Sequence, residues 1–447
     1  MTEEKDMLKG SPWHSLIYFA IPVLGALFLQ SLYGAVDMLI VGKFAETADI
    51  SGVATGSIFI NTINNILSGF AVGVTVYVGQ KIGEGNMDKT SRAIGTGVAL
   101  FIVIAIVMSI FLLLFSTNIT SMLHAPAEAF DNTNMYIKIC GGGMIFVIFY
   151  NIIGAILRGV GDSRTPFLTV LIACFINIIG DLILVAGFHM GAAGAAIATV
   201  FAQGVSVICS IAIVLRKKFN FELGFRFIRF DKEITKSIVK LGTPIGFQEF
   251  LIGMSFIVIR TVVNSISVTA SAGMGIAEKI CGFTMLVSSA FYQSVSVFTA
   301  HNIGANQHKR AKLGLKYGIM TAMPIAIVIA SITFFKGDFL ASIFTNTNNP
   351  MVISRAHQYL KAYSIDTVLT SILFCYIGYY NGCGKTFFVM MRGIISALAV
   401  RIPVVLFMRS ITDSSLFLIG LAAPITTTFE LLCCIWYAYY LRKHNNI

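Results

Sequence analysis

Long apolar stretches without a charged residue recur along the whole chain. Residues 10–36, 50–80, 93–127 and 182–215 contain no Asp, Glu, Lys or Arg. A helix of about 20 residues crosses a hydrocarbon core about 30 Å thick. The pattern predicts twelve membrane-spanning helices separated by Gly and Asn turns and by Lys- and Arg-rich helix ends. The expected spans are centred near Leu27, Asn64, Ile104, Met144, Asn177, Ala202, Phe250, Leu286, Ala326, Leu369, Ala397 and Cys433.

Composition agrees with this pattern and sets the class of protein. Hydrophobic residues make up 56% of the 447 residues and charged residues only 12%, whereas soluble domains carry about 25% charged residues. We therefore expect an all-α polytopic membrane protein. The eight cysteines lie almost entirely in apolar runs and form no CxxC motif, which indicates small core residues rather than metal ligands or disulfides.

The positive charges are distributed unevenly between alternate connections. Of the 32 Lys and Arg residues, 23 fall in the connections that include both termini, Arg392 among them, and only five fall in the opposite set. This bias places both termini and the segment 216–240 in the cytoplasm of a multi-pass plasma-membrane protein. The net charge of +11 is explained in this way and does not indicate a nucleic-acid partner. Residues 1–11 lack the basic region and cleavage site of a secretory signal, so we expect the first span to be retained.

The two halves of the sequence repeat each other at a fixed offset of about 222 residues. Pro22 and Pro244 open equivalent spans, and the motif around residues 82–86 returns at 303–306. Glycine-rich motifs at 154–161 and 378–384 form a third pair. Six spans per half give both halves the same orientation, so we expect two six-helix lobes related by a pseudo-twofold axis along the membrane normal. The predicted organisation is an N-terminal lobe over 1–215, a cytoplasmic linker over 216–240 and a C-terminal lobe over 241–447.

Several acidic residues fall at membrane depth. Each ionised acid near the centre of a span costs roughly 3 kcal/mol, so such residues are expected to be protonated, paired or exposed to water, and they are functional candidates by default. Arg401 is a candidate neutralising charge, although the sequence does not pair it. The acids are Asp37, Asp181, Glu249, Glu278, Asp366 and Glu430.

The first half carries a set of polar residues with helical spacing. Asp37 shares a helix face with Gln30 and Tyr33, and it lies about 22 Å along the helix from Pro22. Asn177 and Asp181 are one turn apart in the fifth span, and Thr199 lies in the sixth. Carboxyl, amide and hydroxyl oxygens can hold a proton or a small cation such as Na⁺. A structural hydrogen-bond cluster that ties helices together is the alternative interpretation.

The second half gives a less clear picture. Glu278 and Lys279 are adjacent near the end of a span, where their charges are expected to reach the membrane interface. The many Phe and Met residues suit flat, lipophilic organic cations, provided that some of them line a central cleft. Candidate contacts to such a substrate are Gln30, Tyr33, Asn64, Glu249 and Asp366.

Three motifs resemble signatures of the multidrug and toxic compound extrusion family. They are Leu32-Tyr33-Gly34-Ala35-Val36-Asp37 with Val41-Gly42, Leu157-Arg158-Gly159-Val160-Gly161-Asp162 with Thr165-Pro166, and the run from Gly191 through Gly194-Ala195-Ala196 to Ala198-Thr199. Together with the twelve spans and the repeat, the resemblance covers essentially the whole chain.

The resemblance implies a cation-coupled antiporter that expels organic cations by alternating access. In the branch similar to DNA-damage-inducible protein F, it places ion coupling at Asp37, Asn177, Asp181 and Thr199, and a hinge at Pro22. Another branch couples through acids of the seventh and tenth spans. Glu249 and Asp366 are about one turn displaced from those positions, so that role is not transferred to them.

Other function classes compete with antiport. Distant relatives with the same duplicated architecture are flippases for lipid-linked saccharides, but their central cavities tend to be basic, whereas this N-terminal lobe is acidic. An intramembrane enzyme is disfavoured because the chain has no HExxH or GxSxG motif and no catalytic residue is apparent. A channel is disfavoured because no selectivity loop is repeated. We expect a monomer in membrane lipid with organic cations as substrates, H⁺ or Na⁺ as the coupling ion, no other cofactor and no tightly bound metal.

Overall fold

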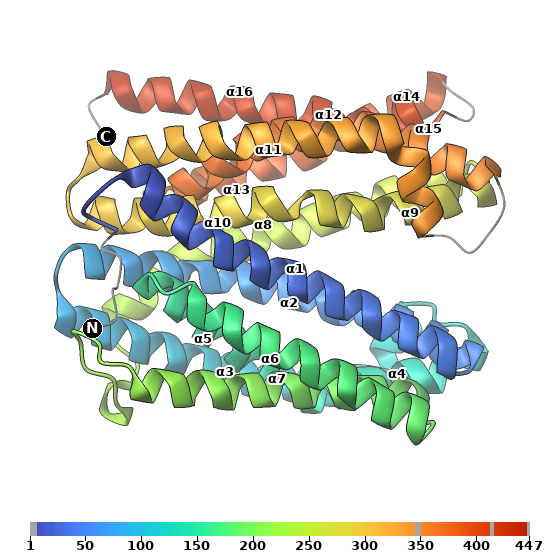
Figure 1. Cartoon of the computed structure of the whole chain (residues 1–447), viewed down its shortest axis with the longest axis horizontal. Helices are drawn as coiled ribbons and strands as arrows, with labels where there is room; N and C mark the ends of the chain where they lie inside the picture. The colour runs from blue at the N-terminus through green and yellow to red at the C-terminus, as the bar shows by residue number, and fades with distance from the viewer. Residues whose placement is uncertain (1–6, 345–349, 412–414, 445–447) are drawn as a thin grey trace. The chain divides into compact units, whose positions relative to one another are not determined.

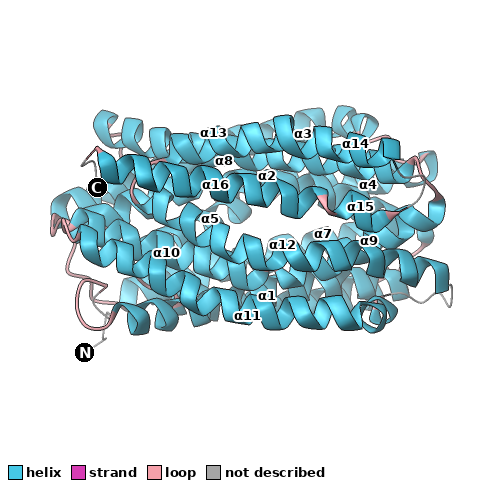
Figure 2. Ribbon diagram, turned by 90° about the horizontal axis from the view of Figure 1, so that it is seen from above, coloured by secondary structure: helices cyan, strands magenta, loops and turns pink. Residues whose placement is uncertain are grey.

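The computed structural model describes residues 7–344, 350–411 and 415–444, and the regular structure of these residues is entirely helical (Figures 1 and 2). Eleven helices in the described part are long and apolar enough to cross a membrane, and a bent pair of helices brings the number to twelve. The predicted all-α fold with twelve spans is confirmed. The α-helices are α1 (Pro12–Phe44), α2 (Thr47–Gly83), α3 (Met87–Met122), α4 (Phe130–Gly142), α5 (Met144–Val160), α6 (Arg164–Asp181), α7 (Gly191–Arg216), α8 (Lys232–Asn264), α9 (Val268–Thr284), α10 (Leu286–Gly304), α11 (His308–Ile343), α12 (Pro350–Gly382), α13 (Thr386–Ile395), α14 (Ile402–Ile411), α15 (Leu416–Gly420) and α16 (Ala422–Lys443).

The chain forms two compact units, and the boundaries between them fall within two helices. We call Gly25–Gly246 the N-unit, and Lys5–Leu24 together with Phe247–Ile447 the C-unit. Helices α1 and α8 therefore each begin in one unit and end in the other. The expected boundaries at 215 and 241 followed the basic segment, whereas the helices cross between the units at 24/25 and 246/247. Both crossings lie just after the repeated prolines, and they are 222 residues apart as the prolines are.

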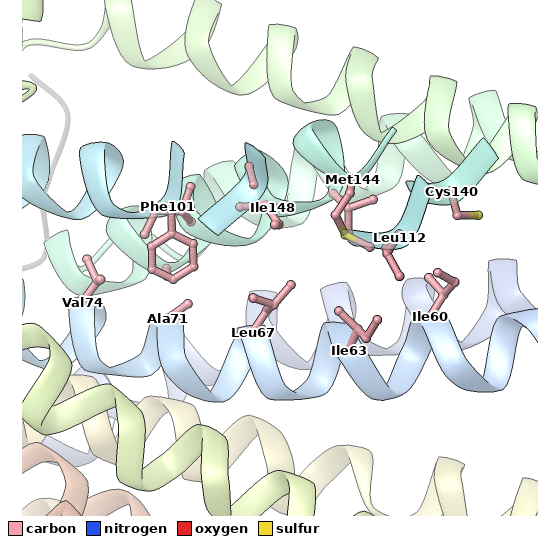
Figure 3. Close-up of a cluster of buried hydrophobic side chains, with 14 of the residues drawn as sticks. Ile60, Ile63, Leu67, Ala71, Val74, Phe101, Leu112, Cys140, Met144 and Ile148 are labelled. Atoms are coloured by element: carbon pink, nitrogen blue, oxygen red, sulfur yellow. The ribbon is translucent and has the colours of Figure 1, made fainter. Parts of the chain in front are cut away.

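The core of the N-unit forms around α2. One face of α2 carries apolar residues three or four positions apart, the spacing that places side chains on one side of a helix. These side chains pack against α3, α4 and α5, as Figure 3 shows. The labelled residues of α2 are Ile60, Ile63, Leu67, Ala71 and Val74, and they face Phe101, Leu112, Cys140, Met144 and Ile148.

The fourth span is bent because two helices meet at a glycine. Helices α4 and α5 are inclined by 53° at Gly143. A Cβ atom at Gly143 would lie 2.2 Å from Cγ1 of Val200 on α7, so a larger residue could not occupy this position without moving the helices apart. The predicted centre of this span, Met144, therefore lies at the bend.

Helix α12 is the centre of the C-unit, where it contacts α9, α10, α11, α15 and α16. It buries polar residues as well as apolar ones, including Asp366 and Thr370. A π-helical turn interrupts the second-to-last span of each half: Leu182–Gly187 follows Asp181 directly, and Ser396–Arg401 ends at Arg401. Single π turns within α-helical spans are frequent at functional sites.

Candidate functional site

Two carboxyl groups lie together inside the N-unit. Asp37 on α1 is 8% exposed, and Asp181 at the end of α6 is fully buried. The two groups are close enough to interact directly. Apart from this mutual contact, no described side chain or backbone group donates a hydrogen bond to either oxygen of Asp181 or to Oδ1 of Asp37. Two buried, interacting acids with three of their four oxygens lacking a donor create a strong local demand for positive charge.

Neutral oxygens lie beside the carboxyl groups. Nδ2 of the buried Asn177 donates to Oγ1 of Thr199 at 3.4 Å, which ties α6 to α7. The Oδ1 atom of Asn177 accepts no hydrogen bond from the described protein. In the described part of the chain, no three His, Cys, Asp or Glu residues are grouped as metal ligands. A small cation in this region would therefore have to use these neutral oxygens together with the acids.

A small cavity in the N-unit adjoins this cluster and contains residues that the sequence analysis did not single out. Gln30 donates to the Tyr150 hydroxyl at 2.5 Å, and Tyr33 interacts with both Asp37 and Gln203. Gln203 follows Thr199 by four positions, so helical spacing could have revealed it. Tyr150 follows a run of apolar residues from 144 to 149 and gave no such signal. The cavity is lined by Tyr33, Tyr150, Val170, Ala173, Asn177, Thr199, Ala202 and Gln203.

The remaining predicted substrate contacts lie outside this cavity. Asn64 is partly buried on α2, and its Oδ1 atom has no donor in the described protein. Glu249, on the part of α8 that belongs to the C-unit, is partly buried and has no ion pair with any described residue. Glu278 approaches Arg260 at 3.9 Å, with both side chains substantially exposed.

The C-unit pairs one of its buried acids with an arginine. Glu430 on α16 contacts Arg392 on α13, and it also accepts a hydrogen bond from Ser396. The sequence had placed Arg392 with the cytoplasmic connections, but its side chain is almost completely buried. A hydropathy pattern cannot distinguish a charged residue at an exposed helix end from a charged residue that is paired with an opposite charge inside the protein.

Asp366 on α12 has a different set of partners. Its carboxyl group interacts with the hydroxyls of Thr370 and Thr427 and with the charge of Arg401. Arg401 donates to the hydroxyl of Ser255 at 3.1 Å. The two units therefore differ at their buried acids: Asp37 and Asp181 of the N-unit have no basic partner among the described residues, whereas Asp366 and Glu430 of the C-unit lie near arginines.

Comparison with known protein families identifies the family to which this chain belongs. The family model MatE matches residues 22–183 and 244–407, so that each matched stretch begins at one of the repeated prolines. The chain belongs to the MatE family. The resemblance noted in the sequence is thereby confirmed at the level of the family.

Relatives of this MatE chain extend over its whole length. It is 24% identical to the probable multidrug resistance protein YoeA of Bacillus subtilis, covering 100% of this chain and 97% of that protein. The multidrug export protein MepA of Staphylococcus saprophyticus is also 24% identical, over 90% of this chain and 88% of MepA.

Solved structures share the fold of this chain. The crystal structure of MATE in complex with MaL6 has a TM-score of 0.93 at 17% identity, with 100% of both chains covered. An outward-facing multidrug resistance MATE family transporter of the MOP superfamily also has a TM-score of 0.93 at 17% identity, with 99% of both chains covered.

Proposed function

We propose that this MatE protein is a cation-coupled antiporter that exports lipophilic organic cations by alternating access, and that the N-unit carboxyl groups bind the coupling ion. The observation that carries the proposal is the pair Asp37 and Asp181, two interacting buried acids without a basic partner among the described residues. Such a pair needs at least one exchangeable positive charge. The multidrug export named for its relatives supports the same direction of transport.

The proposed mechanism is competition for negative charge. When the coupling ion binds at Asp37 and Asp181, the N-unit loses negative charge and its attraction for an organic cation falls. When the ion leaves, the attraction returns. Only such a difference in affinity between states allows an ion gradient to drive export. We favour the proton as the coupling ion because two adjacent carboxyl groups can share one without further ligands; Na⁺ would need Asn177 and Thr199 as well.

The experiment that tests the proposal is efflux of ethidium from proteoliposomes under proton and sodium gradients imposed separately. We expect the proton gradient to drive efflux, and D37N and D181N each to abolish it. Asp88 is an exposed acid paired with Arg92 on α3, so D88N is a matched control with the same chemical change. Variants E249Q and D366N are expected to reduce efflux less. Normal pumping by both N-unit variants, with loss in E249Q, would place coupling in the C-unit.

A flippase for a lipid-linked saccharide is the alternative within the same architecture. Anionic headgroups would require basic side chains that are free to bind them. Arg392, which is buried, and Arg401, which is partly buried, already have acidic or hydroxyl partners, so no observation favours this function. Transport of a lipid-linked sugar without ethidium efflux in the same vesicles would support it over antiport.

A further inference from the structure

Arg401 is held at a fixed position inside the C-unit. Its Nη1 atom donates to Ser255, and its guanidinium lies over the ring of Phe256 at 5.0 Å from the centroid. Both partners are on α8, whereas Arg401 ends the π turn between α13 and α14. A guanidinium held by a hydrogen bond and an aromatic face keeps its charge in place.

The other side of Arg401 faces α12. Its charge interacts with Tyr359, Tyr363 and Asp366, which follow one another at intervals of four and three along one helix face. Asp366 is 5% exposed, and its Oδ1 atom and the Nε atom of Arg401 are both buried without a hydrogen-bond partner in the described protein. The two charges are not within 4.0 Å of one another, so they are neighbours rather than a closed ion pair.

Charges in this region balance without an added ion. Arg392 neutralises Glu430 by direct contact, and Arg401 provides a second positive charge next to Asp366. The N-unit pair has no comparable residue. The halves repeat in sequence and in helix order, so the different environments of the Asp37–Asp181 pair and of Asp366 and Glu430 distinguish their roles.

We propose that Arg401 is the resident counter-cation of Asp366 and that its fixed charge keeps the coupling ion away from this carboxyl group. This inference rests on the proposed function and specifies it further: Asp366 takes no part in ion coupling, and Arg401 limits how many ions are exchanged for each substrate. Replacing Arg401 with a neutral residue leaves Asp366 as a buried carboxyl that must bind an ion from solution. The C-unit then gains an ion site.

The test is the coupling stoichiometry in proteoliposomes. It is measured as the power of the imposed ion concentration ratio across the membrane to which the final ethidium concentration ratio is proportional. We expect R401Q to raise this exponent by one relative to the wild-type protein, and R401Q/D366N to return it to the wild-type value. R409Q is the matched control, since Arg409 lies eight residues further along the same span. An active R401Q protein with the wild-type exponent would overturn the inference.

A second measurement covers the case in which R401Q inserts and can be purified but does not transport ethidium. In a cycle of thermal unfolding in detergent, R401Q and D366N should each lower the melting temperature, and the double variant should recover most of the loss because both charges are removed together. A double variant no more stable than the worse single variant contradicts the pairing. If D37N retains wild-type coupling while this cycle shows recovery, the proposed function fails and the pairing of Arg401 with Asp366 stands.

Discussion

The side-chain amide of Asn177 donates to the hydroxyl of Thr199, and this bond links α6 to α7 one helical turn before the buried Asp181. It holds the amide nitrogen in place and leaves the amide oxygen without a donor in the described protein. A neutral acceptor that is buried and unused next to two acids is suited to a cation. The same oxygen is not needed to bind a proton that the two carboxyl groups share.

Substitutions at this bond should therefore distinguish the two coupling ions. In T199V, efflux driven by a proton gradient should fall by no more than about fivefold, which corresponds to the roughly 1 kcal/mol of one neutral hydrogen bond. The measurement is ethidium efflux from proteoliposomes at several pH values. If sodium drives transport instead, loss of this oxygen should raise the sodium concentration needed for half-maximal efflux at least tenfold, and that outcome would reverse our preference for protons.

The buried ion pair of the C-unit predicts a specific pattern of stability. R392M leaves the Glu430 carboxyl buried without its partner and should lower the free energy of unfolding by about 3–5 kcal/mol. In R392M/E430L both charges are replaced by apolar groups of similar volume, so most of the loss should be recovered. Thermal unfolding in detergent measures both variants. R92Q, which breaks an exposed pair with Asp88, should cost less than about 1 kcal/mol. Equal losses in the single and double variants would contradict this assignment.

The prolines of α1 and α8 are expected to act as matched hinges. Each proline removes a backbone hydrogen bond within its helix. Pro22 and Pro244 each lie two residues before the last residue of the unit in which the helix begins. P22A should reduce turnover about tenfold, equivalent to about 1.4 kcal/mol in the barrier, while leaving ethidium affinity nearly unchanged. P244A should show the same separation of effects, and P324A, in the interior of α11, serves as the control. Full turnover in P22A would remove this residue from the mechanism.

The predicted membrane orientation can be measured by cysteine labelling. Glu128, in the short 3₁₀ turn before α4, and Lys218, just after α7, are both exposed. A membrane-impermeant maleimide should label E128C on intact cells and K218C only after permeabilisation. The native Cys383 should contribute little background, because burial raises the pKa of its thiol to about 12 and keeps it protonated at neutral pH. Reversed labelling would invert the orientation.

Helix positions followed from the sequence because charge-free runs of spanning length determine them directly. Helical spacing also predicted that Asn177 and Asp181 share a face, and in the structure Asn177 bonds to Thr199 while Asp181 interacts with Asp37. The exchange of helix beginnings between the units was not predictable, since hydropathy describes each segment alone and says nothing about which distant segment it packs against. Burial of Arg392 against Glu430 escaped detection for the same reason.

The central claim is that an organic cation and the coupling ion compete for the carboxyl groups of Asp37 and Asp181. The most direct test is proton release when ethidium is added to purified protein in weakly buffered detergent. We expect about one proton released for each ethidium bound by the wild-type protein, because one shared proton satisfies the pair, and no release from D37N or D181N. Unchanged release from both variants, or ethidium binding to the wild-type protein without release of a proton or of Na⁺, would contradict the account.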